Sequence, residues 1–184
     1  MGYRNGVTRI EEERKREIED AIEYARSLIH LTGAAVRIPI EEIGQFNIVL
    51  SKGIVFNSRG LARMLKGCAE ALLMGATAGK EIMEAIDNDS KTNRLTRGVI
   101  LDAVASEMVD DSLDWIADYF NGQLRRENRR LTKRRFSAGY GDFLLENQKI
   151  MYDVLELGTL GVELTESFML VPQKSVTAVA GIMG

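Results

Sequence analysis

Arg135 and the turn that follows it are the residues of this sequence best suited to binding chemistry. The segment Ser137-Ala138-Gly139-Tyr140-Gly141 contains two glycines in five residues, and glycine lets a backbone turn and lets another molecule approach closely. The guanidinium of Arg135 offers five N–H donors in a planar fork, which suits a carboxylate. Tyr140 adds an aromatic face for stacking. The pattern indicates either a site for a carboxylate-bearing ligand or an ordinary turn.

Glu107 is a second candidate, because it lies among the apolar residues of a long expected helix. A carboxylate beside an apolar face must stay in contact with water or find a partner. Glu107 is therefore either a boundary residue of that helix or a carboxylate that binds a cationic or hydroxylated ligand.

The remaining chemically active residues do not form a recognisable cluster. His30 and Cys68 are the only histidine and cysteine, and one of each, far apart in the sequence, is not expected to form a metal site. Residues 125–135 include seven basic side chains in eleven. They lack interleaved aromatic residues and the chain has a net charge of −3, so nucleic acid is not the expected partner. A solvated surface is the first interpretation and docking of an acidic protein the second.

Composition indicates a globular protein with one core. The chain has 184 residues, of which 45% are hydrophobic and 28% charged, and this length suits a single domain. We expect an N-terminal helix within residues 1–34 and a core over 35–184. The N-terminus lacks a signal-peptide pattern, no apolar run is long enough for a membrane, and a single cysteine forms no internal disulfide. These features favour a cytoplasmic protein without a membrane partner.

The first half of the sequence predicts helices and short strands in irregular order. Thr8 and Glu11 form a capping-box pattern, so the first helix should cover about 8–31. Alternating apolar residues predict strands around 36–40, 46–50 and 54–56, the first of them an edge strand because Pro39 lacks a ladder donor. Ser58 is suited to cap a short helix to Leu65. The apolar run 69–76 predicts a buried strand, followed by a helix over about 80–88.

The second half predicts two helices and a hairpin. Apolar residues at helical spacing indicate a long helix over about 92–120, whose acidic residues Asp110, Asp111, Asp114 and Asp118 form its wet face, and another helix over 144–157. Strands at 166–171 and 175–182, joined by the turn Pro172-Gln173-Lys174, should pair with each other. Without regular strand–helix alternation, the fold class predicted is α+β, with a mixed or mainly antiparallel sheet.

Several separated motifs resemble one known family. They are R-F-S-A-G-Y-G-D, L-T-E-S-F, P-Q-K-S-V-T-A-V-A-G-I, F-N-S-R-G-L-A-R-M-L-K-G-C-A-E-A-L-L-M-G-A-T-A-G and I-L-D-A-V-A-S-E, which together cover residues 56–182. In this order they are similar to the activation domain, the S-adenosylmethionine-binding domain, of cobalamin-dependent methionine synthase. The resemblance implies a twisted, mainly antiparallel sheet with flanking helices.

The resemblance also implies a function. Such domains bind S-adenosylmethionine for the reductive methylation of inactive cob(II)alamin, which is held by the cobalamin-binding module, while flavodoxin or another electron donor supplies the electron. Carried over onto this sequence, the ligand-binding residues are Arg135, Ser137, Gly139, Tyr140 and Glu107. No side-chain nucleophile is required, because cob(I)alamin is itself a strong nucleophile and the protein need only position the reactants.

The resemblance has departures, among them a different N-terminal helix, and it leaves alternatives open. After Tyr140 this chain continues G-D-F-L-L-E-N-Q-K, where the fused domain has a cysteine- and histidine-containing stretch that faces the corrinoid. The G-Y-G-D form is similar to a stand-alone version of the domain. The first alternative is a non-catalytic partner of a corrinoid protein that has lost the ligand site. The second is reactivation of a different corrinoid methyltransferase.

Overall fold

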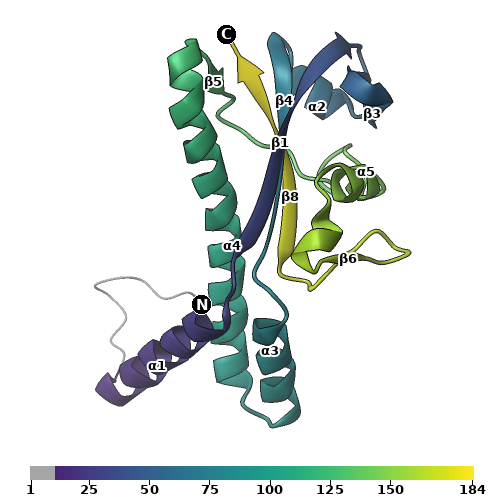
Figure 1. Ribbon diagram of the computed structural model, residues 1–184. Helices are drawn as coiled ribbons and strands as arrows, with labels where there is room; N and C mark the ends of the chain where they lie inside the picture. Colours follow the sequence, from purple (N-terminus) through teal and green to yellow (C-terminus); the bar gives the residue numbers. More distant parts are fainter. Residues whose placement is uncertain (1–10) are drawn as a thin grey trace.

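A six-stranded antiparallel sheet organises the computed structural model, which describes residues 11–184 (Figure 1). The strand order is β3-β2-β1-β4-β8-β5, and two further strands form a small separate sheet, β6-β7. Their bounds are β1 Thr32–Ile43, β2 Asn47–Leu50, β3 Ile54–Asn57, β4 Cys68–Thr77, β5 Arg130–Leu131, β6 Glu163–Leu164, β7 Leu170–Val171 and β8 Ser175–Met183. Strand β4 lies between two long partners, with β1 on one side and β8 on the other.

Helices cover both faces of the sheet. The first face carries α1 (Glu12–Leu28), α3 (Glu81–Lys91) and the long α4 (Leu95–Leu124), which extends along the sheet in Figure 1. The second face carries α2 (Arg59–Met64), α5 (Asn147–Val154) and the 3-10 turn η3 (Leu157–Leu160). Two shorter 3-10 turns, η1 (Ser51–Gly53) and η2 (Arg125–Glu127), connect other elements.

Alternate side chains of β4 pack into two separate hydrophobic cores, one on each face of the sheet. Leu72, Met74 and Ala76 pack with α1, α3 and α4 on the first face, whereas Ala71 and Leu73 pack with α2, α5 and η3 on the second. Successive side chains of a strand point to opposite faces, so a strand covered on both sides is apolar throughout. This explains why the sequence of β4 is a continuous apolar run although its neighbours are antiparallel.

Most predicted elements are present, with shifted ends. The first helix ends at Leu28, three residues earlier than expected; Thr8 of the predicted capping box lies outside the described residues. The capping role of Ser58 is confirmed, since its Oγ accepts from the backbone N–H of Leu61 at 2.9 Å. The long helix extends to Leu124, and the helix expected over 144–157 is confined to Asn147–Val154.

The prediction that Pro39 marks an edge strand is wrong. Strand β1 lies inside the sheet and pairs with β4 through Thr32–Pro39 and with β2 through Ile40–Ile43. Pro39 is therefore at the position where the β4 ladder ends and the β2 ladder begins. A residue without a backbone donor is tolerated at such a change of partner.

The predicted C-terminal hairpin is also wrong. Residues Leu170–Val171 pair with β6 rather than with the strand that follows them, and β8 pairs with β4 and β5. The intervening turn therefore sends the chain from the small sheet into the large one. The two-stranded sheet and the start of β8 consequently stand next to each other, which matters for the groove described below.

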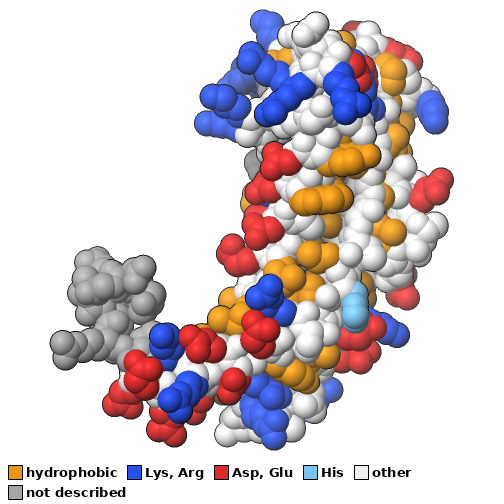
Figure 2. Space-filling model, turned by 60° about the vertical axis from the view of Figure 1, so that its left-hand side comes forward, with side chains coloured by type: hydrophobic (Ala, Val, Ile, Leu, Met, Phe, Trp, Pro, Cys, Tyr) orange, Lys and Arg blue, Asp and Glu red, His pale blue; other side chains and the backbone are white. Residues whose placement is uncertain are grey.

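Charged side chains are unevenly distributed over the surface. Figure 2 shows basic side chains gathered at one end of the molecule. Figure 1 places the C-terminal end of α4 at this end. The residues that follow α4, 125–134, are mostly exposed. Among the helices of residues 11–184, none is both long and apolar enough to cross a membrane. The same residues contain no group of three or more histidine, cysteine or acidic side chains suited to hold a metal ion.

Candidate functional site

The turn after Arg135 is closed by backbone hydrogen bonds. Gly139 N–H donates to the carbonyl of Phe143 at 2.7 Å, and Tyr140 N–H donates to that of Ser137 at 3.2 Å. Gly139 has φ of 89°, a left-handed conformation that glycine adopts without a Cβ penalty. The expected glycine-dependent bend is therefore present, and Gly139 shapes it.

Both ends of this turn are fixed to the sheet and to α2. Phe136 exchanges two backbone hydrogen bonds with Val179 of β8, at 2.9 and 2.8 Å. On the far side Asp142 accepts from Ser58 Oγ at 2.8 Å and from the N–H groups of Arg59 and Gly60. The Ser58 hydroxyl and these N–H groups hold the pKa of Asp142 below its ordinary value. A carboxylate at the start of α2 thus anchors the turn.

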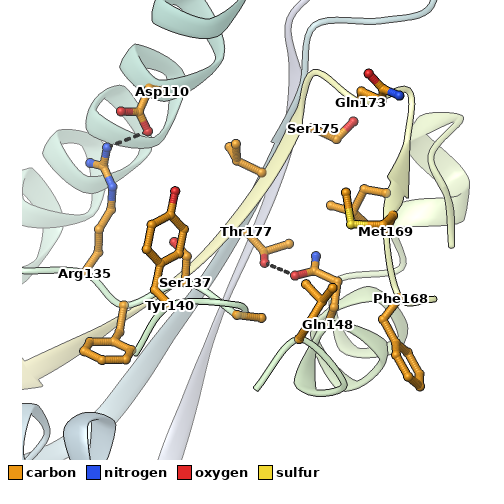
Figure 3. Close-up of a pocket in the computed structure, with 15 residues that line it drawn as sticks. Asp110, Arg135, Ser137, Tyr140, Gln148, Phe168, Met169, Gln173, Ser175 and Thr177 are labelled. Atoms are coloured by element: carbon orange, nitrogen blue, oxygen red, sulfur yellow. Dashed lines mark hydrogen bonds and ion pairs between the residues drawn. The ribbon is translucent and has the colours of Figure 1, made fainter. Parts of the chain in front are cut away.

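A groove of about 600 Å³ lies beside the turn (Figure 3). Its walls come from four parts of the chain: the turn, α4, the start of α5, and the segment from the loop before β7 into β8. The lining residues are Asp110, Arg135, Phe136, Ser137, Ala138, Tyr140, Leu145, Gln148, Phe168, Met169, Leu170, Gln173, Ser175, Val176 and Thr177. Polar and apolar side chains are mixed, as in sites that bind small organic molecules.

Arg135 reaches α4 at one side of the groove. Its guanidinium pairs with Asp110 at 3.0 Å and with Asp114. Burial alone lowers the pKa of Arg135, but the two carboxylates more than offset this, so the pKa lies above its ordinary value. Asp110 and Asp114 are 67% and 65% exposed, so water screens both ion pairs. The guanidinium is therefore held by two carboxylates that remain in contact with water.

Comparison with known proteins gives a structural match. No protein-family model matches the sequence, and no curated protein matches it. The crystal structure of the MetH reactivation domain bound to AdoHcy superimposes with a TM-score of 0.71 at 17% sequence identity, over 98% of this chain and 70% of that chain. The chain has the fold of the MetH reactivation domain. The predicted α+β class, with a mainly antiparallel sheet and flanking helices, is confirmed.

Within this reactivation-domain fold, the structure brings together three of the five predicted site residues. Arg135, Ser137 and Tyr140 line the groove, and Tyr140 is 71% exposed. Gly139 shapes the turn but is not among the lining residues. Glu107 is exposed on α4 and is not among them either.

Asp110 lies at the groove where the sequence had suggested Glu107. Both residues are on α4, three positions apart, so they are neighbours on the helix surface. The sequence placed Asp110 and Asp114 on the wet face of this helix. They are exposed, as expected, but they also pair with Arg135. Asp110 and Asp114 pair with Arg135 and Glu107 does not, because of where the turn lies relative to α4.

Gln148 is a second groove residue that sequence reasoning missed. It occupies the first turn of α5 and is only 4% exposed. Its Oε1 accepts from the Thr177 hydroxyl at 3.0 Å, whereas its Nε2 has no hydrogen-bond partner in the described part of the chain. The signal available in the sequence was a glutamine between the apolar residues Leu145 and Met151, which a helix would place on one face with them.

Proposed function

We propose that this chain is a cytoplasmic reactivation component of a cobalamin-dependent methionine synthase. It binds S-adenosylmethionine, which supplies the methyl group for reductive methylation of cob(II)alamin on a cobalamin-binding partner. A flavodoxin-like protein or another electron donor provides the reducing equivalent. The observation that carries the proposal is an arginine-lined groove beside a glycine turn, in a chain with the fold of the MetH reactivation domain.

The residues of the groove fit this ligand at its amino-acid end. A methionine-type zwitterion has a carboxylate and an ammonium group close together. Arg135 supplies the cation for the carboxylate, and Asp110, its neighbour in the groove, supplies an anion for the ammonium. Opposite charges held side by side match the zwitterion better than either would alone.

The size and the remaining lining also fit. A groove of about 600 Å³ lies within the range of roughly 300–1,000 Å³ typical of small-molecule sites. Tyr140 is exposed and offers an aromatic ring for stacking. The apolar side chains that line the groove include Leu145, Met169 and Val176. The chain itself needs to supply binding, orientation and shelter from water rather than a nucleophile.

Titration calorimetry with S-adenosylmethionine tests the proposal directly. The protein is titrated alone and in the presence of the cobalamin-binding module of a methionine synthase. We expect saturable binding of one ligand per chain in at least one of the two conditions. If neither condition gives binding, the proposed function is wrong.

The engaged state of Arg135 favours a second candidate function. Because Asp110 and Asp114 already pair with this guanidinium, the chain could instead bind a corrinoid protein without any ligand of its own. Capture of the cobalamin-binding module on the immobilised chain, with and without S-adenosylmethionine, separates the two functions. Capture that responds to the ligand supports reactivation, and capture that ignores it supports the non-catalytic partner.

A further inference from the structure

Gln148 has an unusual environment for a buried amide. Within residues 11–184, its Nε2 is the single buried side-chain nitrogen or oxygen without a hydrogen-bond partner. An unpaired buried amide group destabilises the folded state, and folded proteins rarely leave one. Because Gln148 also lines the groove, its free N–H is available to a ligand bound there.

The amide is held in a defined orientation. The Thr177 hydroxyl of β8 donates to Gln148 Oε1 at 3.0 Å, and both residues are buried. If the amide were turned over, Thr177 would accept from the nitrogen and the oxygen would be unpaired instead. Either way, the Thr177 hydroxyl satisfies one end of the amide and leaves the other end for a ligand.

The position of Gln148 separates it from the charged end of the groove. Figure 3 shows Arg135 and Asp110 on one side, and Gln148 with Met169 and Phe168 on the other. The groove also has apolar lining, from Leu145, Met169, Leu170 and Val176. A flat heterocycle with ring acceptors suits such surroundings, because its faces contact apolar side chains and its edge forms hydrogen bonds.

We propose that Gln148 recognises the adenine base of the bound nucleoside, with Nε2 donating a hydrogen bond to a ring nitrogen. The inference rests on the proposed function, which places the amino-acid end of the ligand at Arg135 and leaves the base for the far side of the groove. Glutamine is suited to this role, since its amide N–H donates to the ring nitrogens at adenine edges. Thr177 acts as a positioning residue that fixes the amide.

The test measures binding of S-adenosylhomocysteine and of its 1-deaza, 3-deaza and 7-deaza analogues by calorimetry. Each analogue replaces one ring nitrogen by CH. For the unmodified protein, we expect one analogue to bind about tenfold more weakly than the parent ligand, as the loss of one hydrogen bond to a buried donor requires. Equal binding of all three analogues and the parent ligand would overturn the inference without any variant.

The variant Gln148→Met removes the same hydrogen bond from the protein side, because methionine has a similar length and no hydrogen-bonding amide. We expect it to bind S-adenosylhomocysteine about tenfold more weakly, and to make no distinction between that ligand and the sensitive analogue. Gln123→Met, at an exposed glutamine on α4, is the matched control and should bind all four ligands as the unmodified protein does. Unchanged binding by Gln148→Met would also overturn the inference.

The two proposals fail in different ways. If the unmodified protein binds neither S-adenosylmethionine nor S-adenosylhomocysteine, both the proposed function and the role of Gln148 are wrong. If it binds them with no dependence on the ring nitrogens or on Gln148, only the role of Gln148 is wrong.

Discussion

Two arginines of this chain pair with carboxylates that differ greatly in exposure. Arg97 of α4 forms two hydrogen bonds with Asp89 of α3, whose side chain is 0% exposed, and it lies 4.9 Å from the centre of the Tyr24 ring of α1. Arg135 pairs with Asp110 and Asp114, both mostly exposed and both on α4. The first cluster joins three helices, whereas the second borders a groove.

The difference lies in the carboxylates rather than in the arginines. A buried carboxylate cannot exchange its partner for water, so Asp89 depends on Arg97. Exposed carboxylates are solvated whether or not they are paired, so Asp110 and Asp114 can release Arg135 at little cost. We therefore interpret the Arg97 cluster as structural and the Arg135 cluster as a binding element. Four predictions test this comparison.

The largest expected effect is on stability, from Arg97→Met. This change leaves the Asp89 carboxylate buried and unpaired, which should lower the free energy of unfolding by about 3 kcal/mol. Urea denaturation followed by circular dichroism measures it. The matched control is Arg26→Met, which removes an exposed pair with Glu23 on α1 and should leave the midpoint unchanged. Equal stability of the two variants would contradict a structural role for Arg97.

The stability difference between Arg97→Met and the unmodified protein should depend on pH. In the unmodified protein, hydrogen bonds from Arg97 outweigh burial and hold the pKa of Asp89 below its ordinary value of 3.8. That contribution to stability is complete above the ordinary pKa and is lost as the pH falls through the lower value of the folded state. In the variant, burial without a partner raises the pKa of Asp89. Urea denaturation should therefore show the largest difference near pH 7 and a smaller one below about pH 4, and a constant difference would contradict this account.

Arg135→Ala should affect binding far more than stability. Loss of a charged hydrogen bond to the ligand carboxylate should weaken S-adenosylmethionine binding by about 1.5–3 kcal/mol, and the exposed ion pairs contribute little to folding. Calorimetry and urea denaturation measure the two effects on the same protein. Arg134→Ala, at the exposed neighbouring arginine, is the control. An affinity equal to that of the control would exclude Arg135 as a ligand contact.

The smallest expected effect distinguishes the two carboxylates that contact Arg135. Asp114 pairs with the guanidinium but does not line the groove, so it competes with a ligand carboxylate. Asp114→Asn should therefore strengthen S-adenosylmethionine binding, by up to about fivefold given the typical energy of an exposed pair. Asp110→Asn should weaken it, because Asp110 faces the ligand ammonium. Calorimetry that gives the same direction for both variants would argue against these separate roles.

The sequence was informative about Arg135 and its turn because their signals are local. A guanidinium, two glycines and an aromatic ring within a few residues define a bend with donors around it, and the structure places Arg135, Ser137 and Tyr140 along the groove. Glu107 was a less local inference. Its helix was predicted, but which turn of that helix faces Arg135 depends on how α4 packs on the sheet, and Asp110 lies there instead.

The strand pairings show the same limit. The longer strands were predicted from alternating or continuous apolar residues, whereas the two-residue strands β5 and β6 were not predicted. The partners of Pro39 and of residues 170–171 were assigned incorrectly. Adjacent strands in a sequence often pair, but β8 gains more by joining β4 along its whole length. The pairing of β8 with β4 allows both apolar faces of the strand to be buried at once. This advantage cannot be recognised from any short segment of the sequence.

The sequence by itself determined the local elements of this protein: its helices, the apolar strand at its centre, and the arginine and glycines of the bend. These follow from periodicity, capping and turn chemistry, which act over a few residues. Only the tertiary structure decided which residues meet at the groove. Asp110, Gln148 and Thr177 lie far from Arg135 or from one another in the chain, and packing on the sheet brings them together.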